Sequence, residues 1–136
     1  MNPGDAIGPA TLVEVIANDG PITRCRGRIG DAAAEILVVD ADAPTQVVER
    51  FQRAHETLTR VVHPDVLVTH WLGRLDDGRT AAVRDWTTPA IAPEDSAEAV
   101  DAMRTLLPAV RAAGPALLSE TSPRDLRRRD DGRLVV

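Results

Sequence analysis

Two acidic side chains near the C-terminal end of the sequence could take part in metal chemistry. Glu120 and Asp125 lie in a polar segment, and a pair of carboxylates could hold a magnesium ion, which prefers oxygen ligands. Acidic residues in a polar loop are more often simply solvated, so we expect no metal there. The histidines offer no zinc site, because His55, His63 and His70 follow one another at intervals of eight and seven positions, whereas helical zinc motifs place two histidines four residues apart.

The single cysteine, Cys25, lies between Arg24 and Arg26. Two neighbouring cations favour the thiolate form and could lower the pKa of the thiol. We expect instead a plain exposed cysteine on a strand, without a catalytic role. One cysteine also excludes an internal disulfide and any multi-cysteine metal site.

A group of arginines near the C-terminal end could bind phosphate or an acidic partner. They are Arg124, Arg127, Arg128, Arg129 and Arg133. Three aspartates, Asp125, Asp130 and Asp131, lie among them and cancel more than half of their charge. We therefore expect a solvated hairpin whose charges pair with one another.

The composition narrows the classes of function. The 136 residues suit one domain, and 43% hydrophobic with 27% charged residues is typical of a globular protein. Lysine is absent, which excludes chemistry that needs a catalytic or phosphate-binding lysine. The net charge of -5 argues against nucleic acid as a partner. Only 2% of the residues are aromatic, so aliphatic side chains must build the core.

No apolar run approaches the ~18 to 20 residues needed to cross a bilayer. The first 20 residues also lack a basic start followed by an apolar stretch, which a secretory signal would need. We expect a cytoplasmic protein with no membrane association.

Five segments have the β-branched or alternating pattern of strands, and turn residues separate them. They are residues 11–17, 22–29, 35–39, 66–72 and 80–86. The run 35–39 is almost continuously apolar, as expected of a central strand covered on both faces. The Asp77-Gly78 pair between the last two segments predicts a hairpin. The tryptophans, Trp71 and Trp86, lie in these two segments, and we expect core packing first and an interface role second.

Two segments have the apolar spacing of amphipathic helices. The first runs from about residue 45 to 62, starts after the helix-start residues Asp42 to Thr45, and ends at His63-Pro64. The second runs from about residue 95 to 114 and contains Pro108, which should kink it. A repeated Asp-Asp-Gly-Arg sequence at residues 130–133 predicts a C-terminal hairpin.

The order of these elements predicts the α+β class. We expect an antiparallel five-stranded sheet with a helix between strands 3 and 4, followed by a second helix and a C-terminal β-hairpin. Residues 87–93 contain two prolines and no periodicity, so we expect a connector there.

The same order resembles the small lobe of a protein kinase and the entry to its large lobe. Residues 50–66, with His63-Pro64, are similar to the kinase αC helix and its exit. Residues 72–86 resemble strands 4 and 5 running into the hinge, and residues 118–136 resemble the catalytic loop and the hairpin beyond it. The resemblance implies one kinase-like domain over 1–136, with residues 1–87 like the small lobe and 94–136 like part of the large lobe.

The residues that would bind a nucleotide depart from the kinase pattern. The turn at residues 17–24 holds one glycine, Gly20, where a kinase has a glycine-rich loop. The kinase strand-3 lysine falls on Leu37 or its neighbours, and its αC glutamate partner falls on Ala54, with Glu56 two residues on. None of the strand positions carries charge, and Trp86 with Arg84 would crowd an adenine at the hinge.

The catalytic loop departs as well. Counted from Asp130, the position of the kinase base falls on Glu120 and that of the metal-binding asparagine on Asp125; counted from the preceding helix, the base position falls on Ser119. The sequence has no Asp-Phe-Gly or activation segment after it. We therefore expect no enzyme activity, no bound nucleotide and no cofactor.

The resemblance implies a pseudokinase-like module that acts in regulation or protein interaction through its surface. The second helix packs against a large lobe in kinases, so its apolar stripe would need a protein partner or a second copy. We expect the interface to involve Leu106, Leu107, Val110 and Trp86.

Three other interpretations remain open. One is an atypical ATP and magnesium binder that uses Glu120 and Asp125. Another is a small acidic dimer similar to the chaperones of bacterial secretion systems. The third is a surviving part of a longer kinase-like gene that has no function by itself.

Overall fold

A computed structural model of the chain describes residues 1–60, 67–89, 101, 104–108, 111, 127–128 and 134–135. The chain forms two compact units. The first comprises Met1–Thr59 with Thr69–Trp86, and the second comprises Arg60–Val68 with Thr87–Val136.

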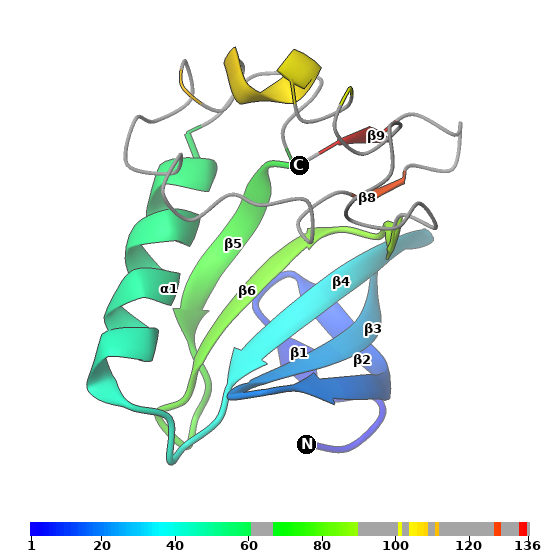
Figure 1. The fold of residues 1–136 in the computed structure, drawn as a ribbon. Coiled ribbons are helices and arrows are strands. Elements are labelled where there is room, and N and C mark those ends of the chain that lie inside the picture. The colour runs from blue at the N-terminus through cyan, green and yellow to red at the C-terminus, as the bar shows by residue number, and fades with distance from the viewer. Residues whose placement is uncertain are drawn as a thin grey trace. The chain divides into compact units, whose positions relative to one another are not determined.

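The first unit is built on a six-stranded antiparallel sheet, which curls along its length (Figure 1). The strand order is β1-β2-β3-β4-β6-β5. The strands are β1 (Ala6–Ile7), β2 (Ala10–Asp19), β3 (Ile22–Ile29), β4 (Ala32–Val39), β5 (Thr69–Arg74) and β6 (Thr80–Asp85). The helix α1 (Thr45–Leu58) follows β4 in the sequence and packs against β5 and β6 (Figure 1).

The sheet has one strand more than the sequence predicted, because the two-residue strand β1 was missed. The α+β class and the antiparallel pairing are confirmed. In the observed order the helix lies between the fourth and fifth strands, so its predicted place between strands 3 and 4 was wrong by that one strand. A strand of two residues is too short to show any periodicity, which is why the pattern did not predict it.

Three successive hairpins have two-residue loops, and each loop begins with a glycine at positive φ. The loops are Gly8-Pro9, Gly20-Pro21 and Gly30-Asp31, with glycine φ values of 56°, 62° and 60°. A glycine at the first loop position gives the twist that adjoining antiparallel strands require. These loops set the register in which the strands begin to pair, and between β2 and β3 that register shifts at two irregularities, between Leu12 and Glu14 and between Val15 and Ala17.

The first unit buries side chains on both faces of the sheet. One face carries a cluster of buried residues: Ile7, Ala10, Leu12, Cys25, Ala34, Ile36, Val38, Ala81 and Val83. On the other face, Leu37, Val39 and Ala82 pack with Phe51 of α1. Alternate residues of β4 therefore enter different clusters, which confirms the prediction of a central strand covered on both sides.

The predicted exposure of Cys25 was wrong. Its side chain is 0% exposed and belongs to the buried cluster on the face opposite α1. Burial raises the pKa of the Cys25 thiol, although Arg79 acts in the opposite direction. The alternation along β3 explains the outcome, because Cys25 falls on the buried side of the strand and the arginines beside it fall on the other side.

The helix α1 starts where the sequence predicted and is shorter at its other end. It begins at Thr45 directly after Pro44, and no side-chain hydrogen bond caps it. It ends at Leu58 instead of about residue 62. The predicted stop at His63-Pro64 lies outside the described residues.

The second unit contains a small antiparallel sheet in the order β7-β8-β9. Its strands are β7 (Thr88–Pro89), β8 (Arg127–Arg128) and β9 (Leu134–Val135). The pairing of β8 with β9 confirms the C-terminal hairpin, whereas β7 lies in the segment predicted to be a connector. Residues 101, 104–108 and 111 are helical, within the predicted second helix. No helix among the described residues has the length and apolarity to span a membrane.

Candidate functional site

The most unusual group in the first unit is a fully buried carboxylate. Glu35 lies in β4, between the apolar residues Ala34 and Ile36, and is 0% exposed. An unpaired charge at such a position is very costly, so a buried carboxylate needs cationic partners. In the described part of the chain, each of the two neighbouring strands supplies Glu35 with a cationic partner.

Among the described residues, Arg24 of β3 and Arg84 of β6 pair with Glu35. Arg24 donates from Nε to Glu35 Oε2 at 3.0 Å. Arg84 donates to Glu35 Oε1 from Nε at 3.0 Å and from Nη2 at 2.7 Å. The side chains of both arginines are largely buried, at 13% and 14% exposed. Both carboxylate oxygens therefore accept charge-assisted hydrogen bonds, which offset the cost of burying them.

The register of the sheet explains why these three residues meet. Glu35 stands directly opposite Arg84 on β6 and opposite Arg26 on β3. Arg24 is two residues from Arg26 on the same strand and so shares its face. Because side chains alternate along a strand, Glu35 also shares the face of Leu37, which packs with α1.

A buried histidine of α1 lies in the same electrostatic environment. His55 Nδ1 is 2.7 Å from Thr69 Oγ1 of β5, and the centroid of the imidazole lies 4.3 Å from that of the Phe51 ring. Burial first, and then the positive charge of Arg84, lowers the pKa of His55 to about 3, although Glu35 acts in the opposite direction. His55 is therefore neutral at pH 7.

Trp86, directly after β6, supports the outer part of this site. Arg24 Cζ lies 4.8 Å and Arg26 Cζ 5.3 Å from the centroid of the Trp86 ring. Guanidinium groups over an indole face make cation–π contacts. Trp86 is half-buried, and it contacts two arginines of β3 that lie side by side on one face of the strand.

Leu37 and Ala54 are the uncharged residues that the kinase resemblance assigns to the positions of the strand-3 lysine and its αC glutamate partner. Leu37 is buried in the apolar cluster with Phe51, and Ala54 is half-buried on α1. Two buried ionisable groups lie close to these positions: Glu35, two residues before Leu37, and His55, one residue after Ala54. Sequence reasoning missed both of them, because Glu35 stands at the start of an apolar run and His55 carries no spacing signal.

The hairpin at the predicted nucleotide loop is short. The strands β2 and β3 are joined by Gly20-Pro21 alone, and Gly20 has a φ of 62°. Proline has no backbone N–H, so this loop offers a single amide donor. The Pro21 carbonyl accepts a hydrogen bond from the Asp40 amide at 2.8 Å, which ties the loop to the end of β4.

The predicted interface residues have different environments. Leu106 is 3% exposed and Leu107 36% exposed, so of the two leucines only Leu107 offers much surface. Trp86 is half-buried beneath the arginines of β3, and Val110 lies outside the described residues. Glu120, Asp125 and the C-terminal aspartates also lie outside them. Within the described part of the chain, no group of three potential metal ligands gathers.

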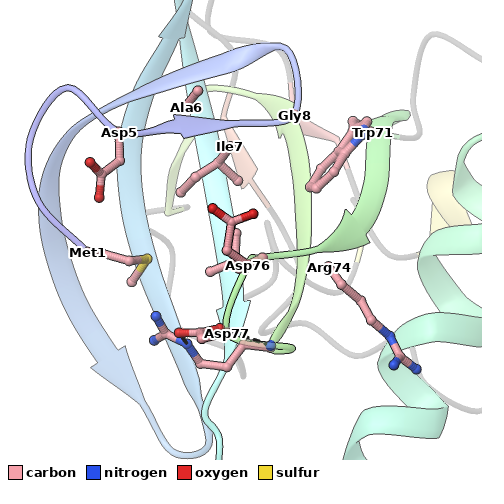
Figure 2. A pocket seen from close by; sticks show the side chains of 11 residues that line it. Met1, Asp5, Ala6, Ile7, Gly8, Trp71, Arg74, Asp76 and Asp77 are labelled. Carbon is pink, nitrogen blue, oxygen red and sulfur yellow. Dashed lines mark hydrogen bonds and ion pairs between the residues drawn. The ribbon is translucent and has the colours of Figure 1, made fainter.

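A separate pocket of about 510 Å³ is formed by the N-terminal segment and the β5–β6 hairpin (Figure 2). At one end Trp71 lies against Gly8, so closely that a Cβ on Gly8 would be 2.3 Å from the indole (Figure 2). Near the other end Arg79 Nε donates to Asp77 Oδ2 at 2.7 Å. That arginine, chiefly through its backbone N–H, holds the pKa of Asp77 below its ordinary value. The pocket mixes both signs of charge and shows no catalytic arrangement among its residues.

Comparison with known proteins identifies the fold. No protein-family model and no curated protein matches the sequence. Two crystal structures of the Mycobacterium tuberculosis PknI kinase domain match with TM-scores of 0.70 and 0.68, each at 18% identity. A cysteine-to-alanine mutant of that domain matches with a TM-score of 0.67 at 17% identity. Each match covers 100% of this chain and 60 to 61% of the kinase chain.

The chain thus spans about three fifths of the length of the PknI kinase domains it matches. The predicted resemblance to protein kinases is confirmed at the level of the fold, and a likeness at this identity extends no further. The chain has a protein-kinase-like fold.

Proposed function

We propose that the chain is a non-catalytic, pseudokinase-like module that works by binding another polypeptide. The observation that carries the proposal is the sign of the buried charge on β4. Glu35 is held there by Arg24 and Arg84, in a fold whose catalytic members use a strand lysine to neutralise the phosphates of ATP.

The Glu35 carboxylate repels a phosphate, and it also occupies the two arginines whose positive charge would otherwise attract one. Two like unit charges ~4 Å apart repel by about 4 kcal/mol at an effective dielectric constant near 20. The sequence contains no lysine, so no lysine from another position can take over the neutralisation of the phosphates. Arg24 and Arg84 are cationic, but both already donate hydrogen bonds to Glu35. If either arginine turned to a phosphate, the buried Glu35 carboxylate would lose hydrogen-bond donors and positive charge.

The loop between β2 and β3 supports the same proposal. Kinases close a glycine-rich loop on the phosphates and use its backbone amides as donors. Here the loop is Gly20-Pro21, and only one of these residues has an N–H. Phosphoryl transfer depends almost entirely on positioned charge and metal, so few groups of the first unit could contribute to it.

Thermal denaturation with increasing ATP and magnesium tests the proposal. We expect the unfolding temperature to stay the same as with magnesium alone, since a ligand that does not bind the native state cannot stabilise it. A saturable rise in unfolding temperature, absent with magnesium alone, would favour an atypical ATP binder. An active kinase domain, measured under the same conditions, shows that the assay detects binding.

A further inference from the structure

The face of β3 opposite the buried side chain of Cys25 carries a row of arginines. Arg24, Arg26 and Arg28, here called the arginine row, alternate with the buried residues Thr23, Cys25 and Gly27. Alternate residues of a strand lie about 6.6 to 6.8 Å apart on one face. The row therefore presents cations at a regular spacing along one strand.

Two members of the arginine row are available to a ligand. Arg24 is committed to Glu35, but Arg26 and Arg28 are exposed. Among the described residues no carboxylate lies within ion-pair distance of Arg26 or Arg28. Glu14 of β2 is the cross-strand neighbour of Arg26 and is itself exposed, so it reduces the positive charge of the row without removing it.

Trp86 holds the middle of the row in place. The Arg26 guanidinium lies over the Trp86 ring, 5.3 Å from its centroid. A stacked guanidinium keeps its N–H donors in the plane of the group, free to meet a carboxylate from the side. Stacking also restricts the side chain before any ligand arrives, which lowers the entropic cost of binding.

We infer that the arginine row binds an acidic polypeptide segment in an extended conformation, with carboxylates on alternate residues. This inference rests on the proposed function and specifies the chemistry of the partner. An extended segment repeats its side chains at the same interval as β3, so two of its carboxylates can meet Arg26 and Arg28 together. Both edges of β3 are already paired with other strands, so the segment cannot join the sheet. It runs along the face of β3 instead and is recognised through its side chains.

Other anions fit the row less well. Nucleic acid would bring many phosphates to a chain of net charge -5 that offers two available cations here. A triphosphate would concentrate its charge close to Glu35. A polypeptide can place single charges at the required interval with neutral residues between them.

A fluorescein-labelled peptide of alternating Glu and Ala, titrated against the full chain, tests the inference by fluorescence anisotropy. The matched peptide replaces each Glu by Gln. We expect saturable binding of the Glu peptide alone, weakened by added salt. In a Trp71→Phe variant, in which Trp86 is the only tryptophan, the Glu peptide should also change the tryptophan emission.

The double variant Arg26→Gln/Arg28→Gln should weaken binding by about tenfold or more, since two charge-assisted contacts are lost. The control is Arg53→Gln/Arg104→Gln, which makes the same charge change at two exposed arginines elsewhere and should bind as the unmodified chain does. The inference is overturned if the Gln peptide binds equally well, or if both double variants lose affinity equally. It is also overturned if tripolyphosphate or a single-stranded oligonucleotide binds and the Glu peptide does not.

The ATP titration reports separately on the proposed function. Stabilisation by ATP with magnesium would overturn the proposed function whatever the peptide does. Failure of the Glu peptide to bind, with no response to ATP, would overturn only the inference about the arginine row.

Discussion

Glu35 of β4 and Arg84 of β6 are direct cross-strand partners, and Arg84 Nη2 lies 2.7 Å from Glu35 Oε1. Together with Arg24, this pair places a net positive, buried ion triad on a face of the sheet that is otherwise apolar where α1 covers it. The triad explains how a glutamate can be fully buried, and it makes the stability of the first unit depend on keeping all of its members.

Removing one partner of the pair should be costly. We expect Glu35→Leu and Arg84→Met each to lower the free energy of unfolding by about 3 to 5 kcal/mol, since each removes a partner from a buried, hydrogen-bonded ion pair. The double variant should recover a large part of that loss. Urea denaturation of the four proteins in this cycle measures the coupling, and additive losses would show that the two side chains do not interact. Arg53→Gln, at an exposed position of α1, should change stability by no more than about 0.5 kcal/mol.

The buried imidazole predicts a dependence of stability on pH. The pKa of His55 is about 3 in the folded chain and near 6.5 in an unfolded chain. Below pH 6.5 the unfolded state therefore binds a proton that the folded state does not, so His55 lowers stability as the pH falls from 6.5 towards 3. Its contribution approaches about 1.4 kcal/mol per pH unit.

The variant His55→Asn isolates this contribution, since an amide can still meet Thr69 but does not titrate. We expect the difference in unfolding free energy between the unmodified chain and this variant to change steadily between pH 6 and pH 4. A difference that stays constant over this range would contradict the assignment of His55 as a buried neutral group.

Cys25 should be inert in the native state. Its side chain is fully buried, and burial raises the pKa of the thiol, so the reactive thiolate is scarce and inaccessible. We expect a chromogenic disulfide reagent to modify Cys25 quickly in urea and only at the rate of unfolding in buffer. Rapid modification of the native chain would show that the β3 alternation is wrong.

The contact between Gly8 and Trp71 can be separated from backbone strain by a matched pair of substitutions. Gly8 and Gly30 have φ values of 56° and 60°, and both begin two-residue hairpin loops. A Cβ on Gly8 would be 2.3 Å from the indole of Trp71, whereas a Cβ on Gly30 would meet nothing within 4 Å.

We expect Gly8→Ala to destabilise the chain by about 1 to 3 kcal/mol more than Gly30→Ala, because Trp71 must move as in an overpacked core. Gly8→Ala should also shift the tryptophan emission, which Gly30→Ala should leave in place. Equal losses of stability from the two substitutions would argue against close packing of Trp71 on Gly8.

Much of the fold follows from hydrophobic patterning. The alternation and the turn residues predicted the five longer strands, and the apolar spacing of an amphipathic helix predicted α1 from Thr45. The patterns failed where an element is too short to carry a period, as with β1 and β7. They also failed at Cys25, where the arginines on either side suggested an exposed strand although alternate residues face the core.

The candidate site could be predicted only in part. Trp86 was identified as a residue of interest, but the Glu35 triad joins residues 11 and 49 positions apart in the sequence. Such a meeting depends on the register of three strands, which the two-residue loops help to determine. A glutamate at the start of an apolar run, with arginines at alternating positions of neighbouring strands, is the signal that could have indicated it.

With its buried Glu35 carboxylate held by Arg24 and Arg84, we expect this kinase-like fold not to bind ATP. Isothermal titration calorimetry of the full chain with ATP and magnesium tests that claim directly. We expect heats no larger than those of dilution, both for the unmodified chain and for the control variant Arg53→Gln, which keeps Glu35. A saturable isotherm with one ATP per chain would contradict it.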